Sequence, residues 1–70
     1  GKALMEEIQK KLRNAIKTSG KTYKEIAKAA SVTPSAISNY MHRDEYPSLD
    51  TFARICKFLD VSADEILGLK

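Results

Sequence analysis

The sequence predicts an all-α domain built from five short helices. Three observations indicate this fold class: apolar residues recur at spacings of three and four, helix-capping residues precede most of these stretches, and no segment alternates apolar and polar residues as a strand would. A chain of 70 residues is long enough for one domain with a small core. We therefore expect a single domain over residues 1–70, with helices at about 4–18, 23–30, 34–42, 49–59 and 63–67.

The first predicted helix, residues 4–18, is amphipathic. Glu, Gln, Lys and Arg separate its apolar positions, which are Leu4, Ile8, Leu12, Ala15 and Ile16. Ser19 and Gly20 end it, because glycine adopts the positive φ of a helix C-cap without a Cβ clash.

Thr22 and Glu25 open the second helix, residues 23–30. Their spacing of three predicts a capping box, in which each side chain accepts a hydrogen bond from the other residue's backbone N–H. The stripe expected to be buried consists of Ile26, Ala27 and Ala30.

Thr33 and Pro34 start the third helix, residues 34–42, since Thr caps well and Pro has a suitable φ for the first helical position. The positions expected inside are Ala36, Ile37, Tyr40 and Met41, and those expected to face outward are Ser35, Ser38 and Asn39. The helix carries no charge before Arg43, where a polar loop to Pro47 begins.

The last two helices are also predicted from caps and stripes. Ser48 is expected to cap residues 49–59, and Ser62 with Glu65 predicts a second capping box before residues 63–67. The core stripe expected on the fourth helix consists of Leu49, Phe52, Ala53, Cys56 and Leu59. Ile66, Leu67 and Leu69 are expected to close the core, and a dimer surface is the alternative for this flank.

Charge is distributed unevenly along the chain, whose net charge is +3. Residues 1–28 hold eight Lys or Arg against three Glu, a balance of +5, whereas residues 29–70 hold four against six, a balance of −2. The asymmetry is typical of a domain with an anionic partner, and a solvated helix face would give the same pattern.

Several classes of protein do not fit this sequence. No apolar run approaches the roughly 20 residues of a membrane span, and no signal peptide is evident. Cys56 is the single cysteine, which excludes an internal disulfide and fits a reducing compartment, so we expect a cytoplasmic protein. Gly1 in place of Met indicates a cloning remnant or an excised piece, so a further domain can be missing.

Two short helices joined by a tight turn, the second with small polar residues outward, match the helix-turn-helix motif. Ala27 is small where the two helices would approach, and Ile37 follows ten residues later to fill their shared core. The run Tyr23–Tyr40, followed by Pro47-Ser-Leu and by Leu59–Leu67, resembles the lambda repressor and Cro-like helix-turn-helix family, of the xenobiotic-response-element type. The resemblance extends from about Ile8 to Leu67 and implies a five-helix lambda-repressor-like fold that binds DNA.

The resemblance also implies which residues contact DNA. The recognition helix would place Pro34, Ser35, Ser38 and Asn39 against base edges, where Asn can pair bidentately with adenine. The expected phosphate contacts are Lys21, Tyr23, Lys24, Lys28, Thr33, His42 and Arg43. For Tyr23, packing of the ring is the alternative, and for the serines, Asn39 and each lysine the alternative is a merely solvated side chain.

Three features depart from the family pattern. Ser31 replaces the usual glycine of the turn, so we expect it to adopt a left-handed conformation at some strain. Ile16 and Met41 replace an Arg and a Glu that pair in several members, so an apolar contact is expected. Asp44 and Glu45 would repel phosphates unless the loop turns them away, or would disfavour wrong sites.

Two other classes of function are alternatives to DNA binding. An enzyme or metal site would need partners for His42 and Cys56, which the sequence does not offer, so we expect no catalysis, metal, cofactor or small-molecule site. A protein-interaction module, such as an antitoxin or adaptor, could use the same scaffold. We predict a sequence-specific regulator of transcription that acts as a repressor and binds double-stranded DNA as a homodimer on a two-fold operator.

Overall fold

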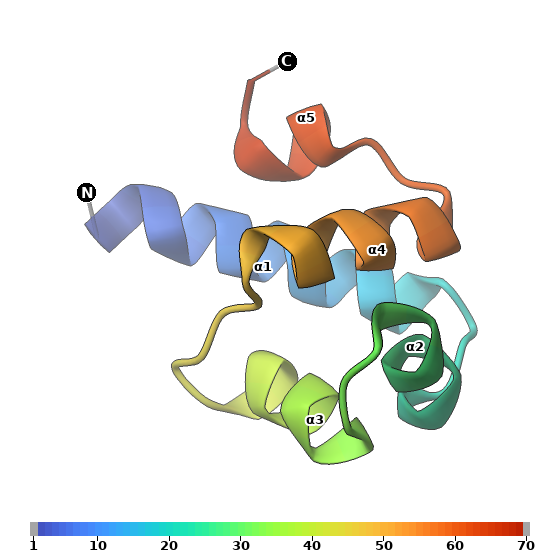
Figure 1. The fold of residues 1–70 in the computed structure, drawn as a ribbon. Coiled ribbons are helices and arrows are strands. Elements are labelled where there is room, and N and C mark those ends of the chain that lie inside the picture. Colours follow the sequence, from blue (N-terminus) through green and yellow to red (C-terminus); the bar gives the residue numbers. More distant parts are fainter. Residues whose placement is uncertain (1, 70) are drawn as a thin grey trace.

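The computed structural model describes residues 2–69, with side chains from Leu4 onward, and folds them into five helices and no strand (Figure 1). The helices are α1 (Lys2–Thr18), α2 (Tyr23–Ala30), α3 (Pro34–His42), α4 (Leu49–Leu59) and α5 (Ala63–Leu67). The predicted all-α class is confirmed, and α1 alone begins earlier than expected. Gly1 and Lys70, which complete the predicted domain, lie outside the described residues.

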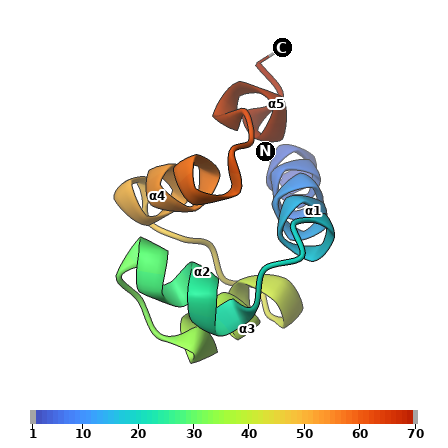
Figure 2. The same cartoon turned by 90° about the vertical axis from the view of Figure 1, so that its right-hand side faces the viewer.

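The helices surround one apolar core. Figure 2 shows α1 and α4 on opposite sides, with α2 and α3 together at one end and α5 at the other. The α2 helix packs on α3 and α4, and α1 contacts α3 and α5. The buried apolar residues are Leu12, Ile16, Ile26, Ala27, Ala30, Ile37, Tyr40, Phe52, Ile55, Cys56 and Ile66. Burial raises the pKa of the Cys56 thiol, because the thiolate would lose solvation there.

The start of α1 corrects one prediction. Leu4 is 54% exposed, because the N-terminal end of α1 extends beyond the helices against which the rest of α1 packs (Figure 1). Gln9 is buried in its place, at 9% exposure, and its carboxamide finds a backbone acceptor in the loop after α3. The stripe that faces the core therefore contains Gln9, Leu12 and Ile16.

The buried face of α4 is also rotated from the one predicted. Leu49 and Ala53, both expected inside, are exposed, and Leu49 reaches 86%. Thr51 and Ile55 are buried beside Phe52 and Cys56 because α4 packs against α2 on that side. Either stripe satisfies helical periodicity, so only the neighbouring helix decides between them.

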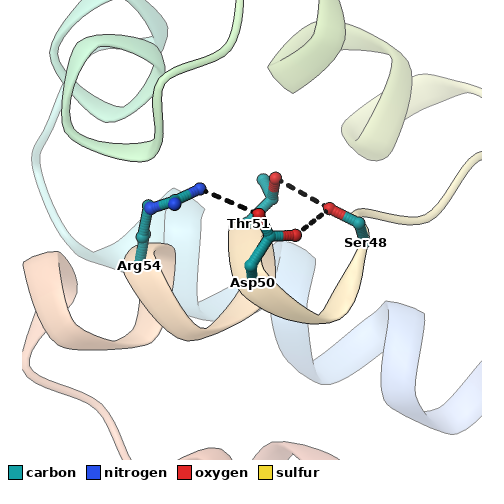
Figure 3. Close-up of polar contacts among 4 residues, drawn as sticks. All are labelled: Ser48, Asp50, Thr51 and Arg54. Carbon is teal, nitrogen blue, oxygen red and sulfur yellow. Dashed lines mark hydrogen bonds and ion pairs between the residues drawn. The ribbon is translucent and has the colours of Figure 1, made fainter.

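Ser48 does not cap α4 as predicted. Its side chain accepts no hydrogen bond from a helical N–H, and Ser48 Oγ instead donates to Asp50 Oδ1 at 2.6 Å and lies 3.0 Å from Thr51 Oγ1 (Figure 3). The hydrogen bond from Ser48 is the main cause that lowers the pKa of Asp50. Asp50 also pairs with Arg54 one turn later at 3.1 Å.

The two predicted capping boxes differ. The one at α2 is complete: Glu25 N–H donates to Thr22 Oγ1 at 3.1 Å and Thr22 N–H donates to Glu25 Oε1 at 2.9 Å. The latter bond lowers the pKa of Glu25. At α5 the prediction was half right, since Glu65 N–H donates to Ser62 Oγ while the exposed Glu65 carboxylate makes no return bond.

Ile66 closes the core as preferred, at 5% exposure, and Leu67 is half-buried. Leu69 is 70% exposed, so the prediction that it helps to close the core was wrong. It follows Gly68, the C-cap of α5, and so lies beyond the end of the helix.

Candidate nucleic-acid interface

The turn between α2 and α3 is held by backbone bonds and by one strained residue. Ser31 adopts the predicted left-handed conformation, with φ 60° and ψ 40°, and ends α2. Val32 N–H donates to the Ala27 carbonyl at 2.9 Å, which reverses the chain, and the Val32 side chain packs on the core. The angle between the two helices is thereby set within a few residues.

The interior of the α2–α3 pair is as predicted. Ala27 is 1% exposed and Ile37 is fully buried, and both belong to the apolar core. Thr33 caps α3 by accepting a hydrogen bond from Ala36 N–H at 3.2 Å, and Pro34 follows at the first helical position. The Thr33 hydroxyl proton can still be donated to an outside acceptor.

The four predicted base-contact residues occupy neighbouring positions on α3. Pro34 and Ser35 are exposed, whereas Ser38 and Asn39, which were expected to face outward, are half-buried. Helical spacing places Asn39 one turn beyond Ser35 on the same side. They form a small polar surface without charge.

Tyr23 and His42 come together from opposite ends of the motif. The Tyr23 hydroxyl lies 3.4 Å from His42 Nε2, which joins the first residue of α2 to the last residue of α3. The Tyr23 ring also packs on the core. Both readings of this tyrosine thus fit its position, since the ring packs while the hydroxyl remains near the surface.

The predicted phosphate-contact lysines do not all lie beside this pair. Lys21 Nζ is 5.6 Å from the centre of the Phe58 ring near the end of α4. Lys28 lines a shallow hollow with Phe58, Glu25 and Ala29. The exposed cations of the motif therefore extend from α3 toward α4, and Lys24 is exposed on α2 between Lys21 and Lys28 in sequence.

The acidic residues after α3 are partly engaged within their own loop. Asp44 Oδ1 accepts a hydrogen bond from the Tyr46 hydroxyl at 3.0 Å. Burial, together with this bond, raises the pKa of Tyr46. Glu45 is exposed. Burial of the Tyr40 side chain raises the pKa of Tyr40, and the negative charge of Glu45 raises it further. Whether these carboxylates disfavour wrong sites stays a prediction.

Two residues beside α3 were missed by the sequence analysis. Arg13 donates to the Tyr40 and Arg43 carbonyls, and Gln9 donates to the Arg43 carbonyl. A signal was present, because Gln9, Leu12, Arg13 and Ile16 follow the spacing of a buried helix face. Ile16 is buried and Met41 packs against the same core, in agreement with the predicted apolar replacement, although a direct contact between them stays a prediction.

The comparison with known families decides what this arrangement is. Residues 10–66 match the profile of a helix-turn-helix family. The chain belongs to the lambda repressor and Cro-like helix-turn-helix family. No curated protein and no solved structure gave a significant match.

Members of this helix-turn-helix family are DNA-binding regulators of transcription, and so is this chain. The matched region includes α2, α3 and α4 in full, together with about half of α1 and most of α5. Within residues 2–69, no helix of this regulator is long and apolar enough to cross a membrane. The described part of the chain also brings no three His, Cys, Asp or Glu side chains together as a metal site.

Proposed function

We propose that this helix-turn-helix regulator binds double-stranded DNA sequence-specifically, with α3 in the major groove, and that it acts as a repressor. The observation that carries the proposal is the α2–α3 pair, which is joined by a turn with backbone hydrogen bonds and presents uncharged polar side chains, exposed or half-buried, along one side of α3. Such side chains suit the donor and acceptor pattern of the major groove, which differs for each base pair. We retain the xenobiotic-response-element type as the expected subtype.

Base reading is assigned to α3. Asn39 can accept from and donate to adenine in one bidentate contact, and Ser35 can serve either type of base edge. Pro34 and Ser38 would add apolar and polar contacts at neighbouring positions. Half-burial of Asn39 supports this role, because a side chain packed on one side has fewer rotamers to lose on binding.

Affinity is assigned to the cations and hydroxyls around α3. Lys21, Lys24, Lys28, His42 and Arg43 are exposed, and Thr33 and Tyr23 supply hydroxyls at the starts of the two helices. Phosphate contacts of this kind fix the register of a protein on the duplex and carry no sequence information. Because α3 itself contains no Asp, Glu, Lys or Arg, most of the electrostatic attraction must come from α2 and the segment before it.

A homodimer on a two-fold operator is part of the proposal. An apolar groove of about 190 Å³ lies between α1, α4 and α5 and is lined by residues that include Met5, Ile8, Tyr46 and Leu67. Leu49 forms part of its wall and is 86% exposed, so each copy can place its Leu49 in the groove of the other. None of the predicted DNA contacts lines the groove, which leaves α3 free in the dimer.

The oligomeric state tests this surface. We expect sedimentation equilibrium to show a dimer for the wild type and a monomer for Leu49→Glu. Lys57→Glu, an exposed residue of the same helix outside the groove, is the control and should leave the dimer intact. A monomeric wild type at high concentration, or an unaffected Leu49→Glu dimer, would contradict the assignment.

Paired substitutions test the division of labour on DNA. Duplexes are first selected from a random pool by the wild-type protein, and binding is then titrated against salt. Asn39→Ala should cost about 1–3 kcal/mol on the selected duplex and leave random-duplex affinity nearly unchanged. Lys24→Ala should weaken binding to both duplexes alike and lower the salt slope by about one.

Two outcomes would reject the proposal. Equal loss on both duplexes for Asn39→Ala would show that this residue does not read bases. No salt-sensitive binding of the wild type even at low ionic strength would favour a protein-interaction module instead. Repression is tested separately, by placing the selected duplex within a promoter and measuring whether the protein lowers transcription.

A further inference from the structure

The C-terminal end of α3 is tied to α1 by three hydrogen bonds. Arg13 Nε donates to the Tyr40 carbonyl at 2.9 Å, and Arg13 Nη2 donates to the Arg43 carbonyl at 2.9 Å. Gln9 Nε2 donates to the same Arg43 carbonyl at 3.2 Å. One guanidinium thus bridges the last turn of α3 and the residue that ends it.

These bonds supply what the end of a helix lacks. The last four carbonyls of a helix have no partner within it, and its C-terminus carries partial negative charge. Arg43 N–H closes the turn on the Asn39 carbonyl at 2.8 Å, and Arg13 then satisfies Tyr40. A guanidinium suits the position, because its planar array of donors reaches two carbonyls and its charge complements the helix end.

These bonds also provide a polar connection between α1 and the end of α3 in a chain without the ion pair of several family members. Ile16 and Met41 stand where several members pair an Arg with a Glu, and both belong to the apolar core here. The polar connection between α1 and the end of α3 comes instead from Arg13, three residues before Ile16, and from the nine-tenths buried Gln9. It acts on backbone carbonyls, so it does not depend on the side chain at position 41.

We propose that Arg13, aided by Gln9, is a positioning residue for base recognition. Arg13 and Gln9 form a clamp on the Tyr40 and Arg43 carbonyls. Tyr40 directly follows Asn39, so the clamp holds the backbone immediately after the residue assigned to read a base. The inference rests on the proposed function of α3. It makes α1, which supplies no predicted base contact, a determinant of sequence discrimination.

The conservative variant Arg13→Lys separates positioning from charge. A lysine keeps the positive charge but places a single ammonium on a flexible stem, and it cannot reproduce the guanidinium's two-carbonyl geometry. We expect its affinity for the selected duplex to fall about tenfold, the scale of one lost charge-assisted hydrogen bond. Its affinity for random duplex and its salt slope should stay near those of the wild type.

One further measurement and two further variants complete the test. Amide hydrogen exchange at residues 40–43, measured without DNA, should accelerate in Arg13→Lys. Exchange at the buried residues of α2, which are Ile26, Ala27 and Ala30, should not change. Lys17→Met removes an exposed charge one turn further along α1, and it should change neither the discrimination between duplexes nor this exchange. Gln9→Ala should lower the discrimination between duplexes and accelerate exchange at residues 40–43, as Arg13→Lys does, but to a smaller extent.

The proposal is overturned if Arg13→Lys discriminates between duplexes as well as the wild type does. Arg13→Ala distinguishes a phosphate contact, since equal loss on both duplexes with a lower salt slope would assign the side chain to the DNA backbone. A wild type that binds no duplex would remove the proposed function and the positioning role with it. Exchange at residues 40–43 would still show whether the clamp exists.

Discussion

The two ends of α3 are held in different ways. At its start, Thr33 accepts from an N–H three residues away, and Pro34 restricts the backbone, so the contacts are local. At its end, the partners of Tyr40 and Arg43 lie in α1, 27 to 34 residues earlier in the chain. Pro34 and Ser35 are therefore positioned by contacts within the first turn of α3. The position of Asn39, near the other end of α3, depends instead on the packing of α1 against α3.

The middle of α3 joins these two ends, and a substitution there should have the largest effect. Ile37 is fully buried, so Ile37→Ala leaves a cavity beneath both halves of the helix and should cost about 2–5 kcal/mol of unfolding free energy. Ile37→Val, with one methylene less, should cost about 0.5–1.5 kcal/mol. Urea denaturation measures both, and similar small losses would mean that α3 is held mainly by its ends.

The local contact at the start comes next in size. Thr33→Ala removes the acceptor for Ala36 N–H and should cost about 1 kcal/mol. Thr33→Ser retains the acceptor and is the control. If the two ends are independent, amide exchange at residues 40–43 will be unchanged once the loss in global stability is allowed for; acceleration confined to those residues would show that the start and the end are coupled.

The turn that leads into α3 should become more stable when its strain is removed. Ser31 has φ 60°, a conformation that glycine adopts freely, so Ser31→Gly should gain up to about 1 kcal/mol. Gly20 has φ 75° with open space around it, and Gly20→Ser provides the reverse substitution, expected to lose a similar amount. Thermal unfolding would contradict this account if Ser31→Gly were the less stable protein.

The smallest expected effect is a dependence of stability on pH, which should arise from the local capping box at Glu25 and not from the long-range bonds at the end of α3. The pKa of Glu25 in the folded protein lies below its ordinary 4.5, so its ionised form stabilises the fold above that value, and this stabilisation is lost as pH falls through the folded pKa. Glu25→Gln keeps the capping geometry without the charge.

The stability difference between wild type and Glu25→Gln should therefore be greatest near neutral pH and shrink below pH 4.5. Glu65→Gln is the control, because the Glu65 carboxylate makes no capping bond and its substitution should matter less. Exchange at residues 40–43, compared between wild type and Glu25→Gln at each pH, should not follow this change, because Glu25 takes no part in the hydrogen bonds that hold the end of α3. A stability difference between wild type and Glu25→Gln that does not vary with pH would show that the charge of Glu25 does not stabilise the fold.

Much of the interface could be predicted because its signals are local. The caps at Thr22 and Thr33 and the left-handed Ser31 each depend on residues within one turn, and each prediction was confirmed. The prediction that Ser48 caps α4 rested on the same local rule and was wrong, because the Ser48 hydroxyl bonds to the side chains of Asp50 and Thr51 instead. The roles of Asn39, of Ser35 and of the phosphate-contact residues are not tested by the fold and stay predictions.

The five helices and most of their ends could be predicted from the sequence alone, because caps and periodicity act over three or four residues. The helix-turn-helix family could also be recognised from the sequence, through the residues of its motif. Tertiary structure decided which face of α4 is buried, why Leu49 is exposed, and that Arg13 reaches the end of α3. A helix pattern offers neighbouring faces of similar hydrophobicity, and only the surface of a distant segment selects one of them. The partners of Arg13 and Gln9 could not be predicted either, because they are backbone carbonyls, which every residue carries whatever its side chain.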